Sequence, residues 1–342
     1  MTTKRFVLGN PLDPKALAQI ADLLRRGGLV AIPTETVYGL AANALDEKAV
    51  ARIFEAKGRP QDNPLIVHID DFFMLKDVAR EIPSAASALA ERFWPGPLTM
   101  VLPRKATIPS SVSAGLDTVA VRMPSHPAAA AMIQSCGLPL AAPSANLSGS
   151  PSPTTAEHVL RDLEGRIDAV ADGGPCTVGL ESTVISLVTE KPRLLRPGGI
   201  TPEQLTEVLG EIEIDPSVTG QIACTVASSP GMKYKHYSPQ ADVIMVRGSL
   251  SRFLKYIASL DRAEGVFALC FEGEEKQIPL PCVTYGRIDE PSEQSRRLFA
   301  ALRELDDKDA KTVYARCPEP SGVGLAVFNR LQRAAAFQMI TL

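Results

Sequence analysis

Short, unbroken apolar runs alternate along most of this chain with stretches whose apolar residues recur at helical spacing. The runs lack the polar–apolar alternation of a half-exposed strand, which favours strands buried on both faces of a sheet. Helix start and stop signals separate the runs. Asp13 followed by Pro14 begins one predicted helix, and Asp46 and Gly58 bound another. We therefore predict an α/β fold with a mixed sheet.

The remaining elements of the first part of the chain follow from the same signals. Thr201 and Gln204 form a capping box that begins a helix ending at Gly210. Helices are also expected at 84–93, 127–135 and 154–164. Strands are expected at 29–32, 65–69, 98–102, 119–123, 138–142, 167–171 and 182–188.

A change of composition divides the chain. With 342 residues, the chain is longer than one core usually serves. Residues 211–240 are rich in proline and small polar residues, and they have no clear periodicity. A second β–α pattern follows, with strands expected at 242–247, 266–271 and 312–316 and helices at 250–260, 291–305 and 323–336. We predict one domain over 1–210, a linker over 211–240 that can act as a lid, and a small doubly wound domain over 241–342.

Composition limits the class of function. The net charge of −3 and the 5% aromatic content argue against extended nucleic-acid binding, although a local basic pocket stays open. The six cysteines include no C-x-x-C pair, so we expect neither a zinc site nor a disulfide framework. No metal ligands are predicted, and neither of the common glycine-rich nucleotide motifs is present.

The sequence pattern does not indicate a signal peptide or a membrane span. The first residues lack the apolar core of a signal peptide. Residues 127–156 carry no charge, but Pro139, Pro143, Pro151 and Pro153 interrupt them, and backbone groups freed there would lack partners in hydrocarbon. We expect a helix, a buried strand and a polar loop instead, in a cytoplasmic protein.

Lys57 and Arg59 lie in KGRPQDNPL, residues 57–65, which we place at the end of a helix and before a buried strand. Both side chains are hydrogen-bond donors only, and the arginine fork suits phosphate oxygens. Asn63 adds an amide. The alternative is a solvated helix end, where lysine favours the helix dipole in any case.

Two further polar stretches flank predicted strands. PTETVYGLAANA at 33–44 holds Thr36 and other hydroxyl groups, and its alternative is an ordinary polar corner. APSANLSGSPSPT at 142–154 contains Ser144, Asn146 and Ser152 without a carboxylate, so it can surround an anion; the alternative is a flexible surface loop. We expect all three stretches where strands end, as ligand sites of α/β proteins are.

Seven motifs, in order, closely resemble the threonylcarbamoyl-AMP synthase family. They are PTETVYGLA, KGRPxxNPLIVHI, FWPGPLTMVL, VAVRMPSHP, PSANLSGSPSPT, GLESTVI and LLRPGG. They cover residues 15–210, and SPGMKYKHYSP at 229–239 resembles the longer, two-domain members. The resemblance implies a YrdC-like twisted mixed sheet around a deep cationic cavity. It also implies a small Rossmann-like three-layer α/β C-terminal domain.

The resemblance also implies roles for single residues. Around the ATP phosphates it places Lys57, Arg59, Ser144 and Asn146, with further nucleotide contacts at Asn63, Thr118, Ser152, Arg196 and Tyr237. Around threonine it places Thr36, His68, Arg122, Ala142 and Ser182. Arg122 suits the amino acid's carboxylate, since its fork is bidentate. From the strand pattern alone, a core histidine is the commoner outcome for His68.

The implied reaction converts L-threonine, bicarbonate and ATP into threonylcarbamoyl-adenylate and pyrophosphate. Mg²⁺ accompanies the phosphates, and a separate transferase passes the threonylcarbamoyl group to the adenosine beside the anticodon of certain tRNAs. No stable nucleic-acid or membrane binding is expected. As a hypothesis, Tyr234, His236 and Tyr237 close over the cavity as a lid, and deleting 229–239 then reduces activity sharply.

Two rival hypotheses belong to other classes. An RNA-binding module would show a steep salt dependence of tRNA binding. A carbamoyltransferase that uses carbamoyl phosphate would be expected to carry zinc-finger cysteines, whose spacing this chain lacks.

Overall fold

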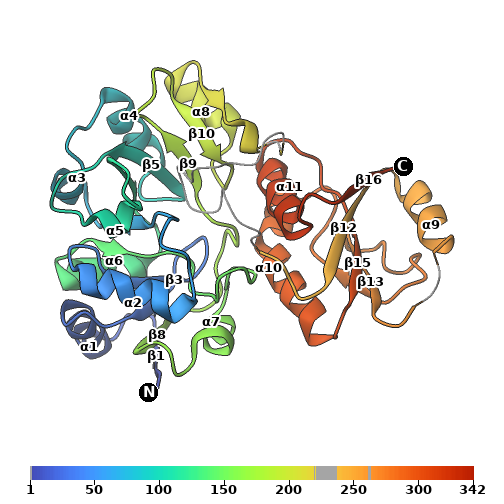
Figure 1. The fold of residues 1–342 in the computed structure, drawn as a ribbon, viewed down its shortest axis with the longest axis horizontal. Helices are drawn as coiled ribbons and strands as arrows, with labels where there is room; N and C mark the ends of the chain where they lie inside the picture. The colour runs from blue at the N-terminus through green and yellow to red at the C-terminus, as the bar shows by residue number, and fades with distance from the viewer. Residues whose placement is uncertain (1, 219, 221–236, 261–262) are drawn as a thin grey trace. The chain divides into compact units, whose positions relative to one another are not determined.

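The computed structural model describes residues 2–218, 220, 237–260 and 263–342 (Figure 1). Contacts within the chain divide it into two compact units. The first unit comprises Met1–Ser148, Ser152–Thr177 and Glu181–Lys233, and the second comprises Gly149–Pro151, Val178–Leu180 and Tyr234–Leu342. The predicted boundaries at 210 and 240 stay predictions.

The first unit is built on one mixed sheet, whose strand order is β1-β8-β2-β3-β7-β4-β6-β5-β9-β10-β11. The strands are β1 (Lys4–Val7), β2 (Val30–Ile32), β3 (Gly39–Asn43), β4 (Ile66–His68), β5 (Leu98–Pro103), β6 (Thr118–Arg122), β7 (Leu140–Ala141), β8 (Ala169–Asp172), β9 (Thr183–Ser186), β10 (Arg193–Arg196) and β11 (Glu213–Ile214). The helices are α1 (Pro14–Arg25), α2 (Glu47–Lys57), α3 (Phe72–Val78), α4 (Ser84–Phe93), α5 (Ser110–Ser113), α6 (Pro127–Cys136), α7 (Ala156–Leu163) and α8 (Pro202–Leu209), with a 3₁₀ turn at Pro216–Val218.

Successive residues of the buried strands belong to cores on opposite faces of this sheet. Val30 and Ile32 pack in one cluster with α1 and α6, whereas Leu29 and Ala31 pack in the other with α2 and α4. Side chains of a strand alternate between the two faces of its sheet, so an all-apolar run such as β2 requires helices on both. This confirms the prediction of an α/β fold with a mixed sheet.

Local capping explains where the helices begin and end. The Asp13 side chain accepts a hydrogen bond from the Lys15 amide, and the Asp46 side chain accepts from Lys48 and Ala49. Thr201 and Gln204 form the complete capping box at the start of α8. These satisfied amide groups are the reason that sequence signals placed α1, α2 and α8 correctly.

The second unit has a five-stranded parallel sheet in the order β14-β13-β15-β12-β16. Its elements are β12 (Asp242–Arg247), α9 (Leu250–Ala258), β13 (Val266–Cys270), β14 (Cys282–Thr284), α10 (Pro291–Asp307), β15 (Thr312–Arg316), α11 (Val323–Ala334) and β16 (Met339–Thr341). Helix α9 covers one face of the sheet, and α10 and α11 cover the other (Figure 1). This three-layer arrangement confirms the predicted doubly wound architecture.

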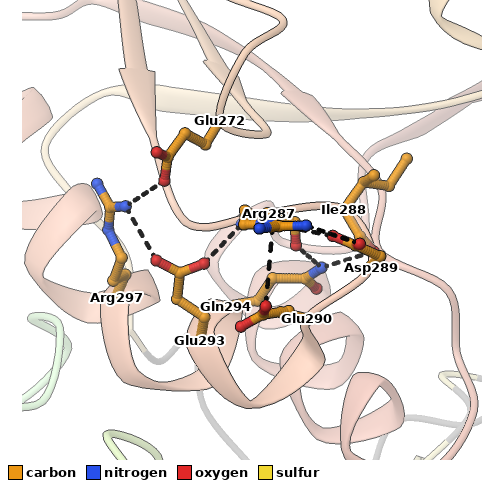
Figure 2. A network of polar contacts seen from close by, with 8 residues as sticks. All are labelled: Glu272, Arg287, Ile288, Asp289, Glu290, Glu293, Gln294 and Arg297. Atoms are coloured by element: carbon orange, nitrogen blue, oxygen red, sulfur yellow. Dashed lines mark hydrogen bonds and ion pairs between the residues drawn. The ribbon is translucent and has the colours of Figure 1, made fainter.

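Polar contacts fasten the loop after β14 to the first turns of α10 (Figure 2). The buried Gln294 amide donates to the carbonyl groups of Arg287 and Ile288 at 2.7 and 3.1 Å. The Glu293 carboxylate accepts from the Arg287 amide at 3.0 Å. Arg297 forms ion pairs with Glu293 and Glu272, but its side chain is 40% exposed. The buried Gln294 amide therefore contributes more to holding the loop on α10 than these ion pairs do.

The predictions missed several short strands. No strand was predicted at Gly39–Asn43, yet this segment is strand β3 and pairs with β2 and β7. The second sheet was expected to have three strands, but β14 and β16, each three residues long, extend it to five. Within the described part of the chain, none of the helices has the length and apolarity that crossing a bilayer demands.

Candidate functional site

Lys57 is the last residue of α2, and it contacts the loop that follows β7. Gly58 ends the helix in the left-handed conformation, with φ of 61°. The Lys57 Nζ donates to the carbonyl oxygens of Ser144 and Asn146, each at 2.5 Å. The Ser148 amide donates to the Lys57 carbonyl at 2.9 Å. Two segments that are distant in sequence therefore meet at one buried ammonium group, on a residue that is 2% exposed.

The Lys57 charge lies in an unfavourable environment. Burial lowers the pKa of Lys57 well below its ordinary value, and the nearby Arg59 charge lowers it further, while Asp162 acts in the opposite direction. A lysine charge held out of water beside a second cation carries an energetic penalty that a negatively charged ligand would reduce. The pair is thus prepared for a negatively charged ligand.

Arg59 and Asn63 lie in the turn that leads into β4. The Arg59 guanidinium donates to the carbonyl oxygens of Asn63 and Pro64 at 3.3 and 3.1 Å. Asn63 is 1% exposed, and neither atom of its amide group has a hydrogen-bond partner among the described residues. A buried amide of this kind carries an energetic penalty that a ligand with donors and acceptors would relieve.

Strand directions bring these residues together. Strand β7 runs antiparallel to β4, so Ser144, which follows β7, lies near the amino end of β4, where Arg59 and Asn63 are. Thr118 begins β6, which runs parallel to β4, and so marks the same edge. The expectation that all three polar stretches follow strands was wrong for 57–65, which precedes β4; the antiparallel β7 is the reason that it still meets 142–154.

Thr36, His68 and Arg122 form a second cluster at the carboxyl ends of β4 and β6. Arg122 donates to the Thr36 hydroxyl at 2.7 Å and to the Gly96 carbonyl at 3.2 Å. Its guanidinium also lies 2.6 Å from the Glu35 carboxylate. Ala142, which is 5% exposed, donates its amide to the Ile66 carbonyl in the adjoining strand.

His68 is 3% exposed, and its Nδ1 lies 3.3 Å from the Ile66 carbonyl. Burial, together with the Arg122 charge, lowers the pKa of His68 to about 3, although the Ile66 carbonyl and Glu35 act in the opposite direction. The imidazole is therefore neutral at ordinary pH and can accept or donate a hydrogen bond without bringing charge.

Ser182 and Arg196 form a third group beside this cluster. Arg196 donates to the Ser182 hydroxyl at 3.1 Å and to the Ser182 carbonyl at 3.0 Å. The Ser182 hydroxyl lies 2.7 Å from the Thr99 hydroxyl, and Thr99 is the register partner of Arg122. The buried Ser152 hydroxyl donates to Glu181, next to Ser182 in the chain.

Tyr237 belongs to the second unit. Its ring lies 5.3 Å from the ring of Phe299, and the Arg330 guanidinium lies 5.5 Å from its centroid. The other two residues of the hypothesised lid, Tyr234 and His236, lie outside the described residues. The roles of all three stay predictions.

Sequence reasoning assigned no role to Glu35, Thr99 or Glu181, each of which contacts a predicted site residue. The charge of Glu35 could have identified it from the sequence, since it is the one acidic residue in PTETVYGLA. Thr99 carried no signal, because only the pairing of β5 with β6 brings it to Arg122.

We call Lys57, Arg59, Asn63, Ser144 and Asn146 the first cluster, and most of its side-chain polar groups are hydrogen-bond donors. Among the residues that the structure describes, no group of three His, Cys, Asp or Glu side chains is placed to hold a metal ion. Guanidinium, ammonium and amide groups bind phosphate or carboxylate oxygens. The first cluster therefore suits a polyanion, and the second suits a small ligand with a carboxylate.

Comparisons with known proteins agree across the chain. A family model described as "Telomere recombination", covering Sua5, YciO and YrdC proteins, matches residues 22–198. A second model, "Threonylcarbamoyl-AMP synthase, C-terminal domain", matches residues 200–336. The chain is similar to the threonylcarbamoyl-AMP synthases of Pyrococcus abyssi (48% identical, 94% of each chain covered) and Bacillus subtilis (47% identical, 99% of this chain and 100% of the relative). The crystal structure of P. abyssi Sua5 complexed with L-threonine aligns with a TM-score of 0.94 at 45% identity, over all of both chains.

Proposed function

The chain belongs to the threonylcarbamoyl-AMP synthase family, and from that membership we propose that it is an L-threonylcarbamoyladenylate synthase, a nucleotidyltransferase. Its substrates are L-threonine, bicarbonate and ATP, and its products are threonylcarbamoyl-AMP and pyrophosphate. A separate transferase then uses the adenylate to modify tRNA. We also propose that the protein acts in the cytoplasm.

One observation supports this proposal above the others: Lys57 and Arg59 are buried side by side, with the pKa of Lys57 depressed by burial and by Arg59. A triphosphate beside Lys57 would stabilise its ammonium charge and so reduce the penalty of burying it. We assign the phosphates to Lys57, Arg59, Ser144 and Asn146, and the rest of the nucleotide to Asn63, Thr118, Ser152, Arg196 and Tyr237.

The second cluster supports threonine as the other reactant. We assign threonine to Thr36, His68, Arg122, Ala142 and Ser182. The solved P. abyssi relative is a complex with L-threonine, which favours the same ligand here. Strand β4 separates the two clusters and spans only about 7 Å along its three residues, so ligands in both sites can react.

The chemistry balances in two steps. Once the threonine ammonium has given a proton to solvent, the neutral amine attacks bicarbonate, the new N–C bond forms, and water leaves, giving a carbamate. A carbamate oxygen then attacks the α-phosphorus of ATP; the new P–O bond forms, the bond to the β-phosphate oxygen breaks, and pyrophosphate leaves. Neither step requires a nucleophilic side chain.

What the residues supply is position and charge. Holding two reactants in contact contributes about 7–11 kcal/mol. The cationic cluster stabilises the charge that builds on the phosphates in the transition state. Mg²⁺ enters with ATP as part of the substrate and is held by phosphate oxygens, so the protein need not supply a set of carboxylate ligands for it.

Pyrophosphate release tests the proposal directly. The purified protein is given ATP with threonine and bicarbonate, and each is omitted in turn. Release is expected only when all three are present, and mass spectrometry should detect the threonylcarbamoyl adenylate. Release that is independent of threonine would contradict the assignment. Release driven by carbamoyl phosphate would favour a carbamoyltransferase, and steeply salt-dependent tRNA binding without release would favour an RNA-binding module.

A further inference from the structure

We propose that Glu35 is the residue that selects a free amino group in the substrate, by pairing with the ammonium of threonine while Arg122 holds the carboxylate. This inference deepens the proposed function and rests on it. Glu35 lies between Thr34 and Thr36 in the loop that leads into β3, and its carboxylate contacts the guanidinium that we assign to the substrate carboxylate.

The Glu35 carboxylate is buried next to Arg122 and keeps acceptor capacity for a ligand. The residue is 6% exposed, and both oxygens are out of contact with solvent. Oε1 lies 2.6 Å from Arg122 Nη2, and backbone groups including that of Ser125 are near enough to stabilise the charge, but among the described residues neither oxygen has a hydrogen bond of good geometry. A buried carboxylate needs several hydrogen bonds in addition to its counter-ion, so this group has unused acceptor capacity.

Glu35 stays charged in this position. Burial alone raises the pKa of Glu35, but the Arg122 guanidinium and nearby backbone groups, including that of Ser125, together outweigh burial and lower it. The site accordingly contains one fixed negative and one fixed positive charge at contact distance. The neighbouring His68 is neutral and the Thr36 hydroxyl is uncharged.

A neutral pair of opposite charges matches an amino acid zwitterion. Threonine has a carboxylate and an ammonium on the same carbon atom, so its ammonium can face Glu35 while its carboxylate faces Arg122. The net charge of the buried site is then unchanged on binding, which limits the desolvation cost. A hydroxy acid without the amine would bring an unmatched negative charge beside Glu35.

A purely structural role is the alternative. In that case Glu35 only orients Arg122, and removing its charge weakens every carboxylate ligand equally. The two roles separate when two ligands are compared: L-threonine, and (R)-3-hydroxybutyrate, which has the same carboxylate, hydroxyl and methyl groups but no amine.

Calorimetry in the absence of ATP measures the affinity of both ligands for wild-type protein and for Glu35→Gln, a substitution that conserves side-chain volume. Wild type is expected to prefer threonine by at least about 100-fold, consistent with a buried charge-assisted contact. In Glu35→Gln we expect threonine affinity to fall by about 100-fold and affinity for hydroxybutyrate to stay within about threefold or improve. Glu35→Asp should recover part of the preference.

Glu55→Gln, an exposed residue of α2, is the matched control, and a thermal melt confirms that each variant folds. An equal loss for both ligands in Glu35→Gln would overturn the inference and assign Glu35 a positioning role. Unchanged threonine affinity would overturn it as well. If wild-type protein binds no threonine at all, the proposed function fails instead, so the two failures are distinguishable.

Discussion

His68 lies directly across from Arg122 in the parallel pairing of β4 with β6, and each residue is 3% exposed. A buried imidazole beside a buried guanidinium cannot readily take up a proton. Burial first, and then the Arg122 charge, lower the pKa of His68 to about 3. The histidine therefore acts as a neutral hydrogen-bonding group within a charged site.

The depressed pKa of His68 predicts a loss of stability in acid. In the unfolded chain the histidine titrates near its ordinary value of about 6.5, so between about pH 6.5 and 3 the unfolded state binds more protons than the folded state. His68 thus stabilises the fold fully above pH 6.5 and progressively less below. The predicted slope is up to about 1.4 kcal/mol per pH unit.

Urea unfolding of wild type and His68→Gln from pH 7.5 to 4.5 measures this slope, since a glutamine side chain does not titrate. The difference in unfolding free energy between the two proteins should shrink as the pH falls. A difference that stays constant over this range would show that His68 is not buried neutral.

Removing the Lys57 charge should abolish most of the synthesis. Lys57→Met keeps the aliphatic stem but removes the ammonium that contacts the carbonyl groups of Ser144 and Asn146. A lost donor at a charged transition state costs about 100- to 1,000-fold in rate, and we expect pyrophosphate release to fall by that amount. Lys48→Met, at an exposed position of the same helix, should change neither rate nor stability. Activity within about threefold of wild type in Lys57→Met would refute the phosphate role.

Local signals made part of this structure predictable. The caps at Asp13, Asp46 and Thr201 act through hydrogen bonds to amides two or three residues away, so the sequence contains all that defines them. Strand β3 was missed because Gly39–Asn43 is made largely of residues that disfavour strands, and its pairing with β2 and β7 overrides that tendency.

The site depends on information that is not local. His68 and Arg122 were named as threonine contacts from motifs, but their adjacency comes from the register of β4 with β6. The meeting of Lys57 with Ser144 likewise comes from the antiparallel course of β7. Strand register depends on packing between distant segments, and for that reason Thr99 and Glu35 received no role from sequence alone.

Replacing Ser182 should weaken the binding of both ATP and threonine. Its hydroxyl contacts Arg196, which we assign to the nucleotide, and Thr99, the register partner of Arg122. Ser182→Ala leaves two buried polar groups with one partner fewer, which costs about 1–3 kcal/mol. We expect the KM values for ATP and threonine each to rise by about tenfold in steady-state assays. Thr189→Ala, in the exposed turn after β9, is the control; an effect on only one KM would show that Ser182 does not couple the two groups.

Alanine at Gly198 should destabilise the fold more than alanine at Gly58. A Cβ on Gly198 would lie 2.3 Å from the Thr183 amide nitrogen and 2.6 Å from the Ser182 carbonyl carbon, and backbone atoms cannot rotate aside. Overpacking of this kind costs about 3 kcal/mol or more and would displace Ser182. At Gly58 a Cβ meets nothing within 4 Å, so only the left-handed conformation is penalised, by about 1–2 kcal/mol. Thermal and urea unfolding of both variants measures the contrast. Equal destabilisation of the two would mean that the close packing of Gly198 on β9 does not exist in solution, and the position of Ser182 would then need another explanation.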